Sequence, residues 1–369
     1  MRTERLTMTT VPVSELKAGL RLQSDVFTEM GSLLLPKGRI LLPRDLEILQ
    51  AFLIQQVEVG TDDLTKSSSE STTVRSGTSE SQGPSLDGRD ESEQFQDEYD
   101  KMVMLVKNAF QSVLVSNLSI YELRGQLESL LVHIQRYNVM TYTPPSMIEV
   151  DYIFHNAVLT SLTSYSIAQW IGLPQKDWMQ VAFAGLLHDI GNAKMDPVIL
   201  YKPSKLTWEE QEEIRRHTSL GYQLLKNVKA INEGVRLAAL QHHEKVDGTG
   251  YPLRLKGEQI HIYAKIVGVA DVFHAMTLEK TYRPAQSPYL VLEQIKSESF
   301  GKLDPSVVQV FIHKLTQFNN GTKVRLNDNR TGEIIFADRD HPTRPLIQVD
   351  GEIINLMLQR ELYIECIVT

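Results

Sequence analysis

The pattern of apolar and polar positions changes character three times along the 369 residues of this chain. Residues 11–61 hold short apolar runs separated by glycine and proline. The runs 33–35 and 40–42 flank Pro36-Lys37-Gly38, a sequence that predicts a hairpin. Leucines at 46, 49 and 53 recur at helical spacing, and Val57-Glu58-Val59 is typical of a short strand. Residues 1–62 are therefore predicted to form a small α+β module.

The next segment, residues 63–94, is dominated by Ser, Thr, Glu, Gly and Asp. Between Lys66 and Gln94 the only aliphatic side chains are Val74 and Leu86. A segment of this composition cannot bury enough apolar surface to offset the entropy that ordering would cost. The pattern predicts a flexible linker.

From residue 95 the apolar positions recur at steps of three and four, as at 120, 123, 127, 130 and 134. Thr207-Trp-Glu-Glu210 has the capping-box pattern of a helix start. Ser287-Pro288 and Asp304-Pro305 each place a capping residue before a proline suited to the first helical position. Residues 95–318 are therefore predicted to be all-helical.

After residue 319 the apolar positions alternate, which is typical of strands, and Asp350-Gly351 predicts a hairpin turn. Residues 319–369 are expected to form a small β appendage. The predicted fold class is mainly α: an all-helical central domain with a small α+β module before it and a small β appendage after it.

Charge and composition exclude some functions. The formal net charge of −8 means that no global positive field attracts a nucleic acid polymer, so phosphate recognition has to be local. No apolar run is long enough to span a membrane, and the N-terminus lacks the pattern of a signal peptide. The single cysteine, Cys366, cannot form an intrachain disulfide, which favours a cytoplasmic protein.

Five of the ten histidines form a series with two carboxylates: His155, His188, Asp189, His217, His242, His243 and Asp271. Imidazoles with carboxylates suit Mn, Fe, Zn or Ni, and one ion needs only three or four protein ligands. Each residue alone could be a buried histidine, a helix cap or an ion-pair partner. The adjacent pairs His188-Asp189 and His242-His243 would be costly to bury without a metal. A site for two or three ions is predicted.

Two motifs carry a resemblance to a known family. The segment 184–191, AGLLHDIG, resembles the HD motif of the HD phosphohydrolases, and 242–252, HHEKVDGTGYP, resembles the HHExxDGxGYP signature of the HD-GYP family. The resemblance covers about residues 150–318. It implies a metal-dependent phosphodiesterase that hydrolyses cyclic di-GMP to pGpG, and in some members on to GMP. It also implies GGDEF-domain proteins as partners.

The resemblance further implies a metal-ligand set, which adds Asp151 to the seven residues above. Asp151 lies one helical turn before His155, where members with three ions have Glu; it could reach a third ion or orient His155. Two ions lower the pKa of a bridging water and neutralise the phosphoryl charge. Asp189 is expected to bridge them, and Asp189 and His188 are the predicted catalytic residues. Iron or manganese is the expected metal, with two or three ions bound.

The predicted substrate-binding residues depart in part from the family pattern. Asn192 stands where the family usually has a Lys that holds phosphate. Lys280 replaces an Arg that makes bidentate contacts, whereas Arg283 matches. Tyr251 offers a ring for stacking and a hydroxyl to donate, or it fills a structural turn. His274 stands where an acidic residue is common, either as a partner of a ligand or as an ordinary helix residue.

These departures leave three functions open. The first is an active cyclic di-GMP phosphodiesterase, supported by the intact ligand set. The second is a weak or inactive receptor that binds cyclic di-GMP without cutting it, suggested by Asn192 and Lys280. The third is an HD phosphohydrolase of another cyclic dinucleotide. The flanking segments are expected to regulate the enzyme or to form a homodimer.

Overall fold

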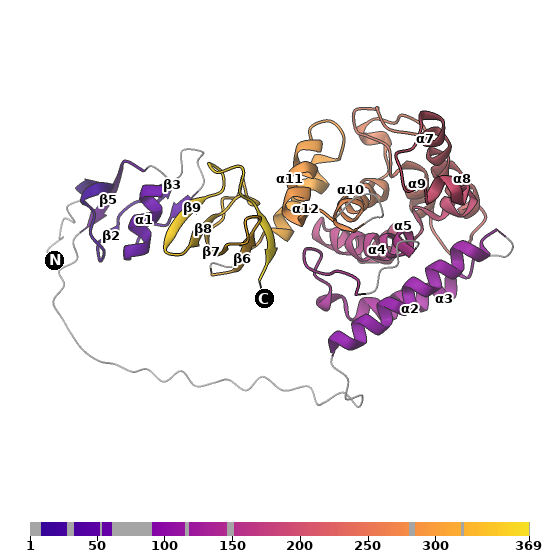
Figure 1. Cartoon of the computed structure of the whole chain (residues 1–369), viewed down its shortest axis with the longest axis horizontal. Coiled ribbons are helices and arrows are strands. Elements are labelled where there is room, and N and C mark those ends of the chain that lie inside the picture. The colour runs from indigo at the N-terminus through magenta and orange to yellow at the C-terminus, as the bar shows by residue number, and fades with distance from the viewer. Residues whose placement is uncertain are drawn as a thin grey trace, which may run out of the picture. The chain divides into compact units, whose positions relative to one another are not determined.

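The computed structural model describes residues 9–27, 33–51, 54–60, 91–114, 118–145, 151–279, 285–318 and 321–368 (Figure 1). These residues fall into two compact units. One contains the described residues of 9–60, 321–323 and 330–362, and the other contains those of 91–318, 324–329 and 363–368. The residues after 320 are thus assigned partly to one unit and partly to the other.

The first unit is small and mixes strands with one helix. Its elements are β1 (Thr9–Pro12), β2 (Arg21–Leu22), β3 (Val26–Phe27), β4 (Leu33–Leu35), α1 (Pro43–Ala51), β5 (Gln56–Gly60), β7 (Thr331–Phe336), β8 (Leu346–Val349) and β9 (Glu352–Asn355). Strands β1 and β2 pair antiparallel with β5, and β7, β8 and β9 form an antiparallel meander. One apolar core joins them, with Leu22, Leu41 and Leu49 fully buried beside Ile335.

The hairpin predicted around residues 36–38 is wrong. Strand β4 pairs with β3, and the run after the turn lies along β2 instead. Leu22 N donates to Arg39 O at 2.9 Å, and Leu41 N donates to Leu20 O at 2.7 Å. The local turn signal was real, but a more distant segment supplies the backbone partners. The turn predicted at Asp350-Gly351 is confirmed: it joins β8 to β9, and both residues have positive φ, 50° and 88°.

The second unit is helical. Its helices are α2 (Glu91–Ser112), α3 (Ile120–Val132), α4 (Tyr152–Trp170), α5 (Gln175–Leu187), α6 (Pro197–Leu200), α7 (Trp208–Arg215), α8 (His217–Leu225), α9 (Glu233–Gln241), α10 (Ile262–Thr277), α11 (Pro288–Glu298) and α12 (Pro305–Leu315), with the 3₁₀ turn η4 (Ile190–Lys194). Strands β6 (Lys323–Leu326) and β10 (Ile364–Ile367) pair antiparallel beside α11. Helix α2 begins at Glu91, inside the segment expected to be linker.

The predicted helix starts are confirmed by their caps. The Thr207 side chain accepts from Glu210 N, and the Glu210 carboxylate accepts from Thr207 N at 2.8 Å, which completes the capping box. Ser287 caps α11 and Asp304 caps α12, each with proline at the first helical position. No helix in the described part of the chain is long and apolar enough to cross a membrane.

Helix α4 forms the centre of this unit. Its side chains are buried on every side from Phe154 to Ala168, apart from Tyr165, so it shows little amphipathic character. It packs against α2, α5, α10 and α12. Because α5, α9 and α10 also pack on one another, the ends of these helices lie near one point, and the candidate metal centre forms there.

Three polar side chains are buried together in this core. His274 Nε2 lies 2.7 Å from Thr163 Oγ1 and 3.3 Å from the Tyr137 hydroxyl, and Tyr137 is 2.8 Å from Thr163. His274 is only 3% exposed, and burial lowers its pKa to about 3 although Asp271 opposes the shift. The ring therefore stays neutral in the folded protein at neutral pH, and it packs as a polar core residue.

The buried His274 is expected to make the metal-free protein sensitive to acid. The unfolded chain takes up a proton below about pH 6.5, whereas the folded one does so only near pH 3, so stability present above pH 6.5 is lost as the pH falls. Between pH 7 and pH 4 the unfolding free energy of the wild type should decrease. In His274→Gln the decrease should be smaller by about 3 kcal/mol, because the buried imidazole is gone. Denaturant unfolding in the presence of a chelator measures this difference. Parallel pH curves for the two proteins would contradict it.

Candidate metal centre

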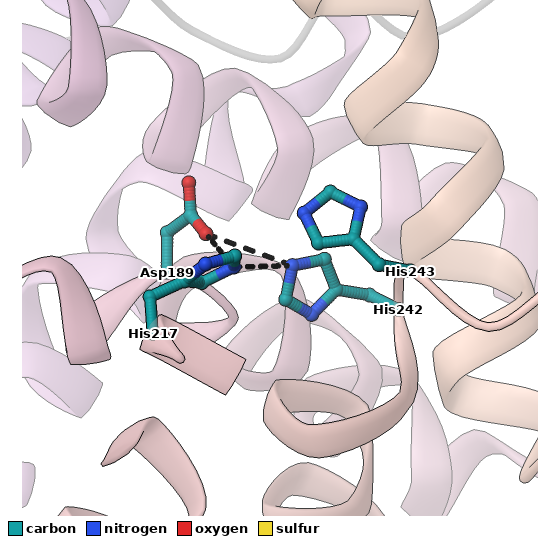
Figure 2. A group of neighbouring side chains, drawn as sticks. All are labelled: Asp189, His217, His242 and His243. Atoms are coloured by element: carbon teal, nitrogen blue, oxygen red, sulfur yellow. Dashed lines mark hydrogen bonds and ion pairs between the residues drawn. The ribbon is translucent and has the colours of Figure 1, made fainter. Parts of the chain in front are cut away.

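Four elements contribute the side chains of the centre. His188 and Asp189 follow the last turn of α5, His217 opens α8, His242 and His243 follow α9, and Asp271 lies within α10. The ligand atoms of Asp189, His217, His242 and His243 all lie within 4.8 Å of one another (Figure 2). Residues up to 83 positions apart in sequence, His188 and Asp271, are thus brought together by helix packing, and four of the predicted ligands form one cluster.

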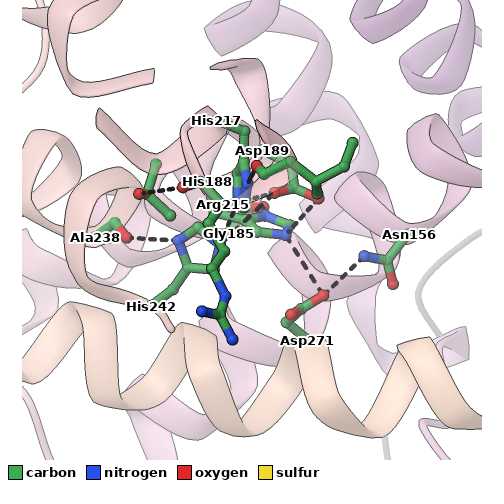
Figure 3. Close-up of polar contacts among 11 residues, drawn as sticks. Asn156, Gly185, His188, Asp189, Arg215, His217, Ala238, His242 and Asp271 are labelled. Carbon is green, nitrogen blue, oxygen red and sulfur yellow. Dashed lines mark hydrogen bonds and ion pairs between the residues drawn. The ribbon is translucent and has the colours of Figure 1, made fainter. Parts of the chain in front are cut away.

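The Asp189 carboxylate lies between two groups of side chains. Its Oδ1 is 3.1 Å from His217 Nε2 and 3.6 Å from His242 Nε2. Its Oδ2 is 3.5 Å from His188 Nε2, and that nitrogen is also 3.5 Å from Asp271 Oδ1 (Figure 3). One carboxylate oxygen thus faces each group, which is the arrangement that a carboxylate shared by two cations requires.

Backbone carbonyls orient the imidazole rings. His188 Nδ1 is 2.7 Å from Gly185 O, His217 Nδ1 is 2.7 Å from Ile214 O, and His242 Nδ1 is 3.0 Å from Ala238 O. A carbonyl only accepts, so each Nδ1 carries the hydrogen and each Nε2 keeps its lone pair when the ring is neutral. These lone pairs face the cluster, as metal ligation needs.

One buried atom tests directly whether a metal fits. His188 is fully buried, and its Nε2 has no hydrogen-bond partner in the structure. A buried nitrogen without a partner would cost free energy in the native protein. A divalent cation between His188, Asp189 and Asp271 would satisfy it, and the mixed imidazole and carboxylate donors suit iron, manganese, zinc or nickel. The residues present therefore fit a metal.

The electrostatics of the centre lead to the same conclusion. Burial alone would lower the pKa of His188, but Asp189 and Asp271 more than offset this and raise it to about 9. Burial alone would raise the pKa of Asp189, but His188 and His217 hold it well below its usual range. Two carboxylates thus stay anionic and favour a cation beside them. A metal ion would take that place by displacing a proton.

Asp271 is held by a neighbour that the sequence analysis did not include. Asn156 Nδ2 donates to Asp271 Oδ1 at 2.9 Å, and Asn156 is 3% exposed (Figure 3). The amide fixes the carboxylate in the orientation that faces His188. Its position next to the predicted ligand His155 was the only signal in the sequence.

Four predicted ligands lie outside the four-residue cluster: His188 and Asp271, whose contacts are given above, and Asp151 and His155. His155 is buried on α4, and its Nδ1 is 2.9 Å from the Tyr99 hydroxyl. Asp151 stands at the start of α4, and its Oδ1 accepts from Lys107 Nζ at 2.6 Å. Tyr99 and Lys107 both come from α2. No local sequence pattern could have indicated that this helix supplies partners to the two residues.

The loop that contains Gly250-Tyr251-Pro252 is fixed by a buried carboxylate. Glu244 is 5% exposed and accepts from Leu253 N at 2.6 Å and from Leu255 N at 2.9 Å. The Tyr251 ring stacks on His243 with ring centroids 4.8 Å apart, and the Arg215 guanidinium lies 5.1 Å from its centroid. Burial raises the pKa of Tyr251, so its phenol stays protonated at neutral pH and can donate a hydrogen bond.

A cavity of about 500 Å³ opens beside the cluster. Asp189, His217, His243, Asp271 and Tyr251 line one part of it. Asn192 also lines it, is 7% exposed, and has a buried Oδ1 without a hydrogen-bond partner in the structure. The predicted substrate-binding residues Lys280 and Arg283 lie outside the described residues.

Comparisons with known proteins agree with the motifs. Residues 142–307 match the HD domain family. Over 185 residues the chain is 32% identical to a cyclic di-GMP phosphodiesterase of Pseudomonas aeruginosa, covering 50% of this chain and 44% of that protein. A cyclic di-GMP phosphodiesterase of Thermotoga maritima is 35% identical over 187 residues, which is 50% of each chain. The 3′3′-cGAMP-specific phosphodiesterase 1 of Vibrio cholerae is 34% identical over 153 residues, covering 41% of this chain and 35% of that one.

The chain spans half or less of the length of these relatives. The matched part contains both motifs and every described residue of the centre from Asp151 to Asp271. Over residues 142–307 the chain therefore matches the HD domain family, and this part is similar in sequence to proteins named as cyclic di-GMP phosphodiesterases.

Proposed function

We propose that this HD domain is a metal-dependent phosphodiesterase that hydrolyses cyclic di-GMP to pGpG, with GMP as a further product. The observation that carries the proposal is the Asp189 carboxylate, whose two oxygens face separate groups of side chains at the edge of a cavity large enough for a nucleotide. Two of the relatives described above are named cyclic di-GMP phosphodiesterases, which supports the same substrate.

The residues of the centre would have distinct roles in binding two ions. His188 and Asp271 would hold one ion, His217, His242 and His243 a second, and Asp189 would be shared between them. Divalent ions bound there would supply a water of lowered pKa and would neutralise the charge on the phosphoryl oxygens. Asn156 keeps the Asp271 carboxylate in place. Iron or manganese is the metal that these donors favour.

Tyr251 and Asn192 would orient the phosphodiester beside the cluster. The Tyr251 hydroxyl is protonated and lines the cavity next to His243, so it would donate to a non-bridging phosphoryl oxygen. The Asn192 amide can also donate, through its nitrogen, but without a positive charge. A Lys ammonium would add charge–charge attraction to the hydrogen bond with a phosphate anion, so Asn192 makes a weaker contact than Lys would.

The test is turnover by the anaerobically purified protein with Mn²⁺ or Fe²⁺. We expect pGpG to appear from cyclic di-GMP, and none to appear after chelation. Incubation with 3′3′-cGAMP in parallel separates the two substrate classes named among the relatives. Tight binding of cyclic di-GMP without cleavage would refute the enzyme and favour a receptor. Cleavage of 3′3′-cGAMP alone would move the proposal to that substrate.

We further propose that the centre binds two ions and not three. The third ion would need Asp151, but Lys107 already neutralises this carboxylate from α2 at 2.6 Å. His155, one turn further along α4, is bonded to Tyr99 from the same helix. The Lys107 ammonium group thus occupies the place beside the Asp151 carboxylate that a third ion would take, whereas the Tyr99 contact at Nδ1 leaves His155 Nε2 available to a metal.

The metal content of the purified protein checks this second proposal. We expect two ions per chain in the wild type at saturating Mn²⁺, measured by mass spectrometry of the metal. Lys107→Met removes the ammonium while keeping most of the length of the side chain, so Asp151 becomes available and the content is expected to rise towards three. Lys101→Met, a change on the same helix at an exposed ion pair, serves as the control. Three ions in the wild type would contradict the proposal.

A further inference from the structure

The cavity extends well beyond the metal cluster. Its volume of about 500 Å³ is typical of sites that enclose a whole small ligand, and it exceeds the space that one phosphodiester fills. Part of its wall comes from the segment 201–206, between α6 and α7, which contributes Tyr201, Lys202, Ser204 and Lys205. This segment contains none of the predicted ligands or substrate-binding residues.

The segment is anchored to α7 by one of its lysines. Lys202 Nζ donates to both carboxylate oxygens of Glu210, at 2.6 and 2.7 Å. Glu210 is also the third residue of the capping box that starts α7, where it accepts from Thr207 N. The charge of Lys202 is therefore neutralised locally, and its role is to fix the position of the segment.

Lys205 differs from Lys202 in this respect. These two are the lysines that line the cavity, and Lys205 is exposed and has no carboxylate partner among the residues that the structure describes. The neighbouring Tyr201 ring is 42% exposed and also lines the cavity. A cation without a counter-charge and a half-exposed aromatic ring, a few residues apart on a fixed segment, favour an anion joined to a flat base.

We propose that Lys205 and Tyr201 form a second recognition site of this cavity, which binds the phosphodiester that is not being cut and the base next to it. The inference rests on the proposed function, because a cyclic dinucleotide has two phosphodiesters and only one can lie on the metal cluster. It also explains how the chain binds a doubly charged substrate although Asn192 carries no charge.

The test compares two substrates that differ in the second phosphate. Cyclic di-GMP has two phosphodiesters, and bis(p-nitrophenyl) phosphate has one. For Lys205→Met we expect kcat/KM for cyclic di-GMP to fall about five- to tenfold, mainly through KM, and to fall much less for bis(p-nitrophenyl) phosphate. The loss of kcat/KM for cyclic di-GMP should become smaller at high salt, because the contact between Lys205 and the phosphate is exposed. Lys229→Met, an exposed lysine outside the cavity, is the matched control.

The outcomes distinguish failure of the second recognition site from failure of the proposed function. Equal losses on both substrates, or a Lys205→Met effect no larger than that of Lys229→Met, would overturn the second site while leaving the proposed function intact. A wild type that cuts bis(p-nitrophenyl) phosphate but not cyclic di-GMP would refute the proposed function. In that case calorimetric binding of cyclic di-GMP to the Mn²⁺-loaded protein still tests the site: binding weakened by both Lys205→Met and Tyr201→Leu supports it, and unchanged binding overturns it.

Discussion

Replacing Asp189 by Asn is expected to lower the turnover of cyclic di-GMP by at least about a thousandfold and to reduce the metal content of the protein. The change keeps the shape of the side chain but removes its negative charge. One of the two oxygens that face His217 and His188 becomes an amide nitrogen, which donates hydrogen and cannot bind a metal. The group with His217 and His242 and the group with His188 and Asp271 both lose the carboxylate that they share.

The change also has an effect that does not depend on activity. A ligand that binds only the folded protein raises its stability, so saturating Mn²⁺ should raise the Tm of the wild type by several degrees, roughly in line with its affinity. Asp189→Asn should gain little. Asp350→Asn, the same substitution in the β8–β9 turn of the other unit, is the control, because Asn tolerates the positive φ of 50° found there. Full metal binding by Asp189→Asn would contradict the shared-carboxylate arrangement.

The sequence predicted those parts of the structure that depend on local patterns. The caps at Thr207, Ser287 and Asp304 start helices because each side chain bonds to a backbone N–H two or three residues later. The turn at Asp350-Gly351 follows from two residues that accept positive φ. Asp189, His217, His242 and His243 were grouped from their residue types and from the family resemblance that the two motifs carry, and their side chains lie together in the structure.

Contacts between distant segments were not predictable from these patterns. Lys107 and Tyr99 are 44 and 56 residues from the partners they bind on α4, and they belong to a helix that has no metal motif. The hairpin near Gly38 failed for the same reason, because β2 competes successfully for the backbone of residues 39–41. Pairing between residues far apart depends on tertiary packing, which overrides a local turn signal.

The cavity wall around Lys205 could not be recognised from the sequence either. Its residues show no pattern beyond a polar connection between two helices, and only their position beside the cluster gives them a role. Whether a lysine can bind a ligand anion depends on whether a carboxylate of the protein already pairs with it. Lys202 and Lys205 have the same side chain, and the Glu210 contact alone distinguishes them.

Gly191 packs closely against the backbone of α8, and Gly191→Ala is expected to destabilise the protein and to displace His217. A Cβ at Gly191 would collide with the His217 carbonyl oxygen and would lie 2.6 Å from Gly221 N, both of which are backbone atoms of α8. Backbone cannot turn aside as a side chain can, so α8 has to move away from η4. We expect a loss of about 3 kcal/mol or more in unfolding free energy.

The matched control makes the same change at a site without neighbours. Gly125 lies in α3, and a Cβ there meets nothing within 4 Å, so Gly125→Ala should raise the unfolding free energy by up to about 1 kcal/mol. Denaturant unfolding in the presence of a chelator compares the two variants without any contribution from metal. Because α8 carries His217, which lies 3.1 Å from Asp189, metal affinity should fall in Gly191→Ala and stay at the wild-type value in Gly125→Ala. Equal stability of the two variants would mean that α8 can shift without cost, and unchanged metal affinity in Gly191→Ala would mean that His217 does not depend on the close contact between η4 and α8.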